Sequence, residues 1–176
     1  MDITAFIARL VFEPFTQLSL LFHNYAYSLV AVLSLITVPQ LRGRGRYVAL
    51  SISMVLVILL SLALKDLYGA PRPCNEWLAS AKACPPPDDF GFPSGHTAFA
   101  FVFVAASLGT IVFPMYLGIG ILVGFSRIYL GVHSLADVAG GALLGILTYL
   151  VVEESIDWAS RTFSVQKKKR GKRNGA

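Results

Sequence analysis

The stretch TAFAFVFVAASLGTIVFPMYLGIGILVGF, residues 97–125, contains no charged side chain and decides the fold. A single helix of this length would exceed a bilayer core of about 30 Å, because each helical residue adds about 1.5 Å. Phe113-Pro114 lies near the middle, and proline interrupts a helix interior. The stretch therefore predicts a hairpin of two short membrane spans, at about 97–112 and 115–131.

The other apolar segments extend this hairpin to an all-α, polytopic helical membrane bundle. Residues 16–38 and 47–64 are each long enough for one crossing, and a further span runs from about 135 to 152. Residues 1–15 are too short to cross and predict an interfacial helix. The chain is thus expected to have five transmembrane helices, or six if residues 3–22 also cross.

Composition agrees with a membrane-embedded chain. Charged residues make up 14% of the sequence and apolar residues 55%, and the mean hydropathy is +0.64. Soluble domains carry about 25% charged residues. At this length there is room for one domain, so residues 1–176 are expected to form a single unit.

Positive charge sets the expected orientation. Arg42, Arg44 and Arg46 form a short basic loop, and residues 162–176 form a basic tail, on the same face of a five-span bundle. Lysine and arginine favour the cytoplasmic side of a membrane. The polar, proline-rich loop at 66–93 would then be extracytoplasmic, and the protein a multi-pass protein of the cytoplasmic membrane.

The tail itself has two readings, because clusters of lysine and arginine bind nucleic acid as well as membrane surfaces. In so apolar a chain, attraction to anionic lipids fits better. We therefore expect the lipid bilayer, and no nucleic acid, as the partner of the tail.

Three polar clusters stand at the ends of the apolar segments. They hold three cations, two histidines and a carboxylate, which are the groups that phosphate chemistry requires. The two crossings of the hairpin return the third cluster to the side of the second. In chain order the clusters are Lys65 with Arg72-Pro73, then Pro93-Ser94-Gly95-His96, then Ser126-Arg127 with His133 and Asp137.

This pattern resembles the three-part signature of the type 2 phosphatidic acid phosphatase superfamily, the integral-membrane lipid phosphatases, over roughly residues 47–150. The resemblance implies that His133 is the nucleophile that takes the phosphoryl group and that Asp137 orients it. It also implies catalysis without a metal ion or other cofactor. His96, at a helix start, is placed to protonate the departing oxygen as a general acid.

Purely structural roles remain open for Asp137 and Ser94. Ser134 to Asp137 is also a capping-box pattern, so Asp137 serves as a helix cap, as a partner of His133, or as both. Ser94 has the composition of an N-cap. A capped helix start also binds phosphate through free backbone N–H groups, and Gly95 lets an anion approach the backbone.

The cations Lys65, Arg72 and Arg127 are expected to bind phosphate oxygens, Arg72 and Arg127 through their planar forks. Lys65 could instead cap a helix end, and Arg127 could anchor the interface. A charged residue inside an apolar stretch is by default a functional candidate, which favours the first reading for Arg127. His23 belongs to no motif and is assigned no role.

Two cysteines, Cys74 and Cys84, lie in the 66–93 loop. Outside the cytoplasm such a pair predicts a disulfide, with two free thiols as the alternative. Cysteines without nearby histidines do not predict a zinc site.

The sequence thus predicts a lipid phosphatase acting through a phosphohistidine. Candidate substrates implied by the resemblance are a polyprenyl diphosphate, phosphatidylglycerophosphate, phosphatidic acid and the phosphate of lipid A, with no choice among them. Two rivals are a vanadium-dependent haloperoxidase, which the charge-free stretch at 97–125 disfavours, and a non-catalytic membrane scaffold, which the complete motif set disfavours.

Overall fold

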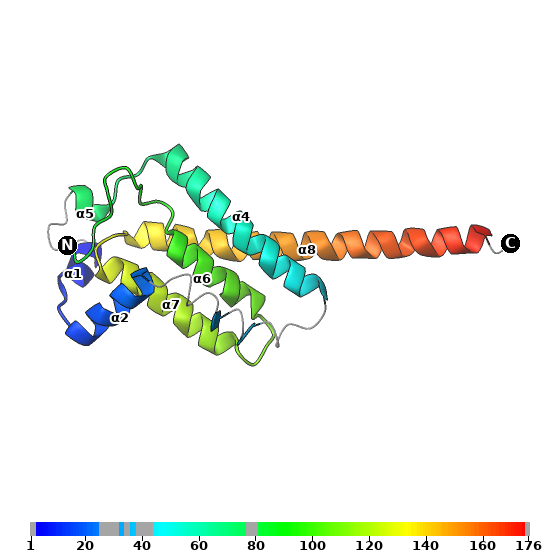
Figure 1. Cartoon of the computed structure of the whole chain (residues 1–176), viewed down its shortest axis with the longest axis horizontal. Helices are drawn as coiled ribbons and strands as arrows, with labels where there is room; N and C mark the ends of the chain where they lie inside the picture. The colour runs from blue at the N-terminus through cyan, green and yellow to red at the C-terminus, as the bar shows by residue number, and fades with distance from the viewer. Residues whose placement is uncertain (1–2, 25–31, 34–35, 38–43, 77–80, 175–176) are drawn as a thin grey trace.

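A computed structural model of the chain describes residues 3–24, 32–33, 36–37, 44–76 and 81–174. Every regular element in these ranges is an α-helix, so the all-α expectation is confirmed (Figure 1). Helices α4, α6, α7 and α8 form the bundle, and α1 and α2 lie against one end of it.

The N-terminal segment folds as two helices with a sharp bend. α1 (Ile3–Arg9) and α2 (Glu13–Asn24) meet at 110°. The expected interfacial helix over 1–15 therefore ends earlier, at Arg9. The first expected crossing, 16–38, begins inside α2, and most of its remainder lies outside the described residues.

Two helices are long and apolar enough to cross a membrane by themselves. They are α4 (Arg44–Tyr68) and α8 (Leu135–Asn174), and the bent α1–α2 pair would make a third candidate if it forms one span. Five or six spans were expected. In the described residues the structure has two or three candidate spans and two shorter apolar helices.

The shorter helices form the expected hairpin, but its break lies elsewhere. α6 (Gly95–Ala106) ends before the expected residue 112, and turns fill the gap until α7 (Phe113–Tyr129) begins. Pro114 lies in the first turn of α7, where a missing backbone N–H costs nothing. The reversal is instead made around Gly109, whose φ of 74° suits a residue without a Cβ.

Helix α8 is longer than expected. The predicted span ended near 152 and the tail began at 162, yet one helix of 40 residues continues to Asn174 (Figure 1). At about 1.5 Å per residue it is roughly twice as long as a bilayer core is thick. No proline follows Pro114 in this sequence, so no residue of the segment lacks the backbone N–H that a continuing helix needs.

The polar loop between α4 and α6 begins after Tyr68 rather than at 66, and it contains the short helix α5 (Pro73–Glu76). Cys74 and Cys84 are joined by a disulfide with a Cα–Cα distance of 5.9 Å. Within the segment that this disulfide closes, the backbone N–H of Lys82 donates to the carbonyl of Leu130 at 2.9 Å. The loop is thereby held over the end of α7.

Glycines let α6 and α8 approach until their backbones touch. A Cβ added to Gly141 would lie 2.4 Å from the carbonyl oxygen of Ser94, and one added to Gly145 would lie 2.1 Å from that of Ala98. Small residues of this kind allow helices to pack closely in membranes, where hydrophobic burial contributes little to helix association. The start of α6 is thus pressed against the first turns of α8.

We predict that Gly145→Ala destabilises the protein. The added methyl would overlap the α6 backbone, which cannot move aside as a side chain can. Overpacking costs about 1–3 kcal/mol, and this site belongs at the upper end. The check is the apparent Tm of the detergent-solubilised protein by circular dichroism. Gly118→Ala in α7 is the control, because an added Cβ there meets nothing within 4 Å; equal melting of the two variants would contradict the packing argument.

Candidate active site

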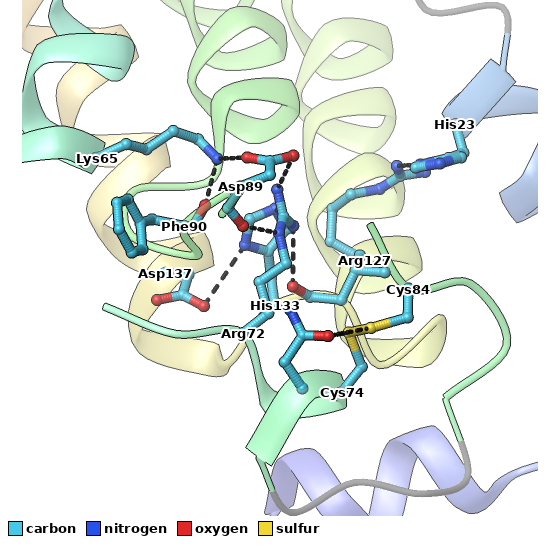
Figure 2. Close-up of polar contacts among 12 residues, drawn as sticks. His23, Lys65, Arg72, Cys74, Cys84, Asp89, Phe90, Arg127, His133 and Asp137 are labelled. Atoms are coloured by element: carbon cyan, nitrogen blue, oxygen red, sulfur yellow. Dashed lines mark hydrogen bonds and ion pairs between the residues drawn. A yellow bond between two sulfur atoms is a disulfide. The ribbon is translucent and has the colours of Figure 1, made fainter. Parts of the chain in front are cut away.

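His133 is held in the short connection between α7 and α8 and is buried there. Its Nε2 lies 2.9 Å from Nη1 of Arg72, and its Nδ1 lies 3.5 Å from Oδ2 of Asp137 (Figure 2). An arginine only donates hydrogen bonds, so Nε2 must be the accepting nitrogen. The proton of the neutral ring is therefore inferred to be on Nδ1, which faces the carboxylate.

Asp137 combines the two roles that the sequence left open. Its Oδ2 accepts a hydrogen bond from the backbone N–H of Ser134 at 2.7 Å, and the Ser134 hydroxyl accepts one from the N–H of Asp137 at 3.2 Å. This is a capping box at the start of α8. The same oxygen faces His133, although 3.5 Å is long and Nδ1 has no hydrogen-bond partner among the described residues.

The ionisation of His133 suits a nucleophile. Burial lowers the pKa of His133 to about 4; the Asp137 carboxylate opposes this shift, and the charge of Arg72 reinforces it. The imidazole is therefore neutral at physiological pH. A neutral ring keeps a lone pair on Nε2, which attack on phosphorus requires.

Lys65 and Arg72 meet at a third residue that sequence reasoning missed. Nζ of Lys65 lies 2.7 Å from Oδ1 of Asp89, and Nη2 of Arg72 lies 2.9 Å from Oδ2 (Figure 2). Lys65 also donates to the carbonyl of Phe90, and Arg72 Nε donates to that of Asp89 at 2.7 Å. Burial alone would raise the pKa of Asp89, but the hydrogen bonds from Lys65 and Arg72 outweigh it and hold the pKa below its usual value.

The Pro93-Ser94-Gly95-His96 cluster lies at the N-terminus of α6. The N–H of Ser94 donates to the carbonyl of Asp137 at 3.0 Å, which ties the second motif to the third. The Ser94 side chain makes no cap hydrogen bond; its hydroxyl accepts one from Thr97 at 3.0 Å. A Cβ added to Gly95 would meet nothing within 4 Å, so there is open space beside this helix start.

Arg127 is completely buried, and its guanidinium is held by the N-terminal segment. Nη2 donates to the carbonyl of Ser19 at 3.1 Å, and Nη1 lies 3.1 Å from Nδ1 of His23. The His23 ring stacks on that of His96 with centroids 6.0 Å apart. His23, a residue to which the sequence analysis assigned no role, therefore lies between Arg127 and His96 of the second motif and contacts both.

One cavity of about 470 Å³ joins these groups. Of the predicted site residues, the structure brings five into its lining, and it leaves Ser94, Arg127 and Asp137 outside. His23 and Asp89 also line it, and most of the remaining wall is apolar and comes from α4, α6 and α7. The five predicted residues in the lining are Lys65, Arg72, Gly95, His96 and His133.

The two missed residues had little local signal. His23 is 104 residues from Arg127 and lies in no motif. Asp89 follows Asp88 in a proline-rich loop, where a carboxylate is expected to be an ordinary solvent-exposed side chain. Its position seven residues before His96, in the loop that joins two phosphate-chemistry clusters, was the available hint.

Comparisons with known proteins agree with this architecture. The family model described as the PAP2 superfamily matches residues 46–161. The chain is 36% identical over 107 residues to an undecaprenyl-diphosphatase of Sulfolobus acidocaldarius, covering 59% of this chain and 52% of that protein. It thus spans about half the length of this relative.

Two solved structures share the fold. The crystal structure of Aquifex aeolicus LpxE superposes with a TM-score of 0.66 at 25% identity, covering 88% of this chain and 99% of that one. A PAP2-type phosphatidylglycerolphosphate phosphatase from Bacillus subtilis superposes with a TM-score of 0.65 at 23% identity, covering 88% and 82%. Since the family model matches more than half of its length, the chain belongs to the PAP2 superfamily, an assignment that agrees with the three polar clusters.

Proposed function

We propose that the protein hydrolyses a phosphomonoester or diphosphate carried by a membrane lipid, through a phosphohistidine on His133. The observation that carries this proposal is that Lys65, Arg72, His96 and His133 line one cavity with apolar walls. The family assignment supports the same reaction class. A lipid phosphate needs both features, because its head group is a dianion and its tail is hydrocarbon.

The first half-reaction transfers the phosphoryl group to the protein. Nε2 of His133 attacks phosphorus, a P–N bond forms, and the P–O bond to the lipid breaks. Burial and the charge of Arg127 lower the pKa of His96 to about 3, so the ring must first take up a proton, which the phosphate dianion bound beside it favours. The resulting imidazolium donates that proton to the departing oxygen. The imidazole of His133 then carries positive charge, which Asp137 stabilises from 3.5 Å across Nδ1.

The second half-reaction returns the protein to its starting state. Water attacks the phosphorus, and His96, now neutral, accepts the proton that the water loses. The P–N bond breaks, inorganic phosphate leaves, and Nε2 recovers its lone pair. Atoms and protons balance over the two steps, with water as the only co-reactant.

Positive charge stabilises the transition state, which spreads negative charge over the phosphoryl oxygens. In this proposal Lys65 and Arg72 bind those oxygens directly. The backbone N–H groups at the start of α6, beside Ser94 and Gly95, add donors and the positive end of the helix dipole. Arg127 lies outside the cavity lining and contributes its charge from behind His23.

The apolar wall is proposed to take the start of the lipid tail. Phe99 and Phe103 of α6 line it together with Val57 of α4 and Val123 of α7. Polyprenyl diphosphate, phosphatidylglycerophosphate, phosphatidic acid and lipid A phosphate are all candidate substrates. Two similar proteins are named for two of these four classes, an undecaprenyl-diphosphatase and a phosphatidylglycerophosphatase B.

The test of this function is phosphate release from a panel of these four lipids by detergent-purified protein. We predict that hydrolysis of the preferred lipid survives excess EDTA, because protein cations already neutralise the phosphate. Vanadate should inhibit competitively by imitating the phosphoryl group. Loss of activity on chelation, restored by Mg²⁺ or Zn²⁺, would contradict the metal-independent mechanism, and release from none of the lipids would contradict the function.

The two histidines should be separable by the leaving group. We predict that His96→Ala loses about 10²–10⁴-fold in kcat on the lipid substrate, the usual worth of general acid catalysis. It should retain much more activity on p-nitrophenyl phosphate, whose leaving group departs without a proton. His133→Ala should be inactive on both substrates.

Saturating kcat values are the measurement, since His96 lines the cavity and its loss would be expected to weaken phosphate binding as well. If both variants lose the same factor on both substrates, the division of roles between the two histidines is wrong. Trapping of a labelled phosphohistidine in wild type but not in His133→Ala would be the matching covalent readout.

We propose that the site faces away from the cytoplasm, as the arginines at 42–46 and the basic tail suggest. Arg44 and Arg46 belong to the first turn of α4 rather than to the expected loop, but they lie at the opposite end of this helix from Lys65. In this orientation the tail lies along anionic lipids of the inner leaflet.

We predict that single cysteines at Ala81 and Gly171, introduced after removal of the native pair, label oppositely on intact cells. An impermeant thiol reagent should reach position 81 only; labelling of the tail alone would invert the topology.

A further inference from the structure

The carboxylate of Asp89 lies where the proposed phosphate oxygens would bind. One oxygen contacts Lys65 at 2.7 Å and the other contacts Arg72 at 2.9 Å (Figure 2). Both cations come from the first polar cluster, and both line the cavity together with Asp89. A carboxylate bridging a lysine and an arginine makes the same contacts that two oxygens of a phosphate group would make.

The remaining donors of Arg72 are also engaged. Nη1 lies 3.0 Å from the carbonyl oxygen of Val132 and 2.9 Å from Nε2 of His133, and Nε donates to the carbonyl of Asp89. The lone pair proposed to attack phosphorus is therefore held by Arg72 in this arrangement. A phosphate group entering the site meets cations that are already paired and a nucleophile that is already bonded.

Asp89 is the most exposed member of this charged cluster. Its side chain is 46% exposed, whereas that of Arg72 is 6% exposed. Asp89 is thus the solvent-facing member of the pair, and an anion that takes its place would keep the buried cation paired. The loop that carries Asp89 is also free of regular secondary structure between residues 81 and 94, so the side chain can withdraw without unfolding a helix.

We propose that Asp89 is a positioning residue that competes with phosphate for Lys65 and Arg72. In the empty site it keeps the two cations together in the geometry that phosphate requires. When the lipid phosphate binds, it displaces the carboxylate, and the donors of Arg72 turn from His133 to the phosphoryl oxygens. After hydrolysis the returning carboxylate weakens the hold on inorganic phosphate and promotes its release. This inference rests on the proposed function, because it assigns Lys65 and Arg72 to phosphate.

The test is the affinity for inorganic phosphate and vanadate, measured directly by isothermal titration in detergent with the full-length protein. Asp89→Asn keeps the shape and removes the charge, and we expect it to bind both anions about tenfold more tightly, equivalent to about 1.4 kcal/mol. Asp89→Glu should restore wild-type affinity. Asp88→Asn is the matched control, since it removes the same charge from the neighbouring position, which is exposed and makes no hydrogen bond or ion pair with a described residue.

Kinetics give the second readout. In Asp89→Asn the KM for the lipid and the inhibition constant for phosphate should both fall, and kcat should not rise. If Asp89 only held the two cations in place, its loss would instead raise both constants. Weaker anion binding, unchanged binding, or an equal effect of Asp88→Asn would each overturn the proposal, as would failure of the wild type to bind either anion.

These outcomes are separable from those of the proposed function. Anion binding does not require turnover, so tighter binding by Asp89→Asn in a protein that hydrolyses none of the lipids would uphold the competition and reject the function. Hydrolysis by the wild type, with no gain in anion affinity for Asp89→Asn, would uphold the function and reject the competition.

Discussion

The contact between the backbones of α6 and α8 is the constraint on which the site depends. Gly141 and Gly145 leave no room for a Cβ against α6. That closeness lets the N–H of Ser94 reach the carbonyl of Asp137 at 3.0 Å. Two motifs about 40 residues apart in the chain are thereby brought together by a main-chain hydrogen bond. Side-chain contacts alone would leave the distance between His96 and His133 less well defined, because long side chains adopt many rotamers.

Electrostatics then determines what the bundle can hold at this place. Buried cations are costly in an apolar surrounding unless they are paired. Asp89 forms ion pairs with Lys65 and Arg72, and the guanidinium of Arg127 forms hydrogen bonds with His23 and with the carbonyl of Ser19. Burial and the charge of Arg72 in turn hold the pKa of His133 near 4, against the opposing effect of Asp137. Burial, reinforced by a cation that is proposed to bind phosphate, therefore keeps His133 neutral.

Sequence reasoning was most successful where the relevant contacts are local. The spacing of His133 and Asp137 on a helix start could be read directly, and so could the charge-free hairpin. Asp89 and His23 could not, because their importance comes from partners 24 and 104 residues away. The hairpin break was misplaced because Pro114 is tolerated in a first helical turn. The length of α8 was missed because polarity was taken as the end of the helix, whereas polar side chains leave the helical backbone hydrogen bonds intact and no proline interrupts the segment.

The length of α4 explains why the phosphate chemistry lies at one end of the bundle. Arg46 and Lys65 are 65 − 46 = 19 residues apart on this helix, which is about 28 Å at 1.5 Å per residue and close to the roughly 30 Å of a bilayer core. The side chain of Arg46 forms an ion pair with Glu153 of α8 at 2.8 Å, and that of Lys65 forms one with Asp89 at 2.7 Å. Between them the helix carries no charged residue. The cavity thus has its cations at the edge of the apolar layer and its hydrocarbon wall inside it, which is the arrangement that a lipid head group and its tail require.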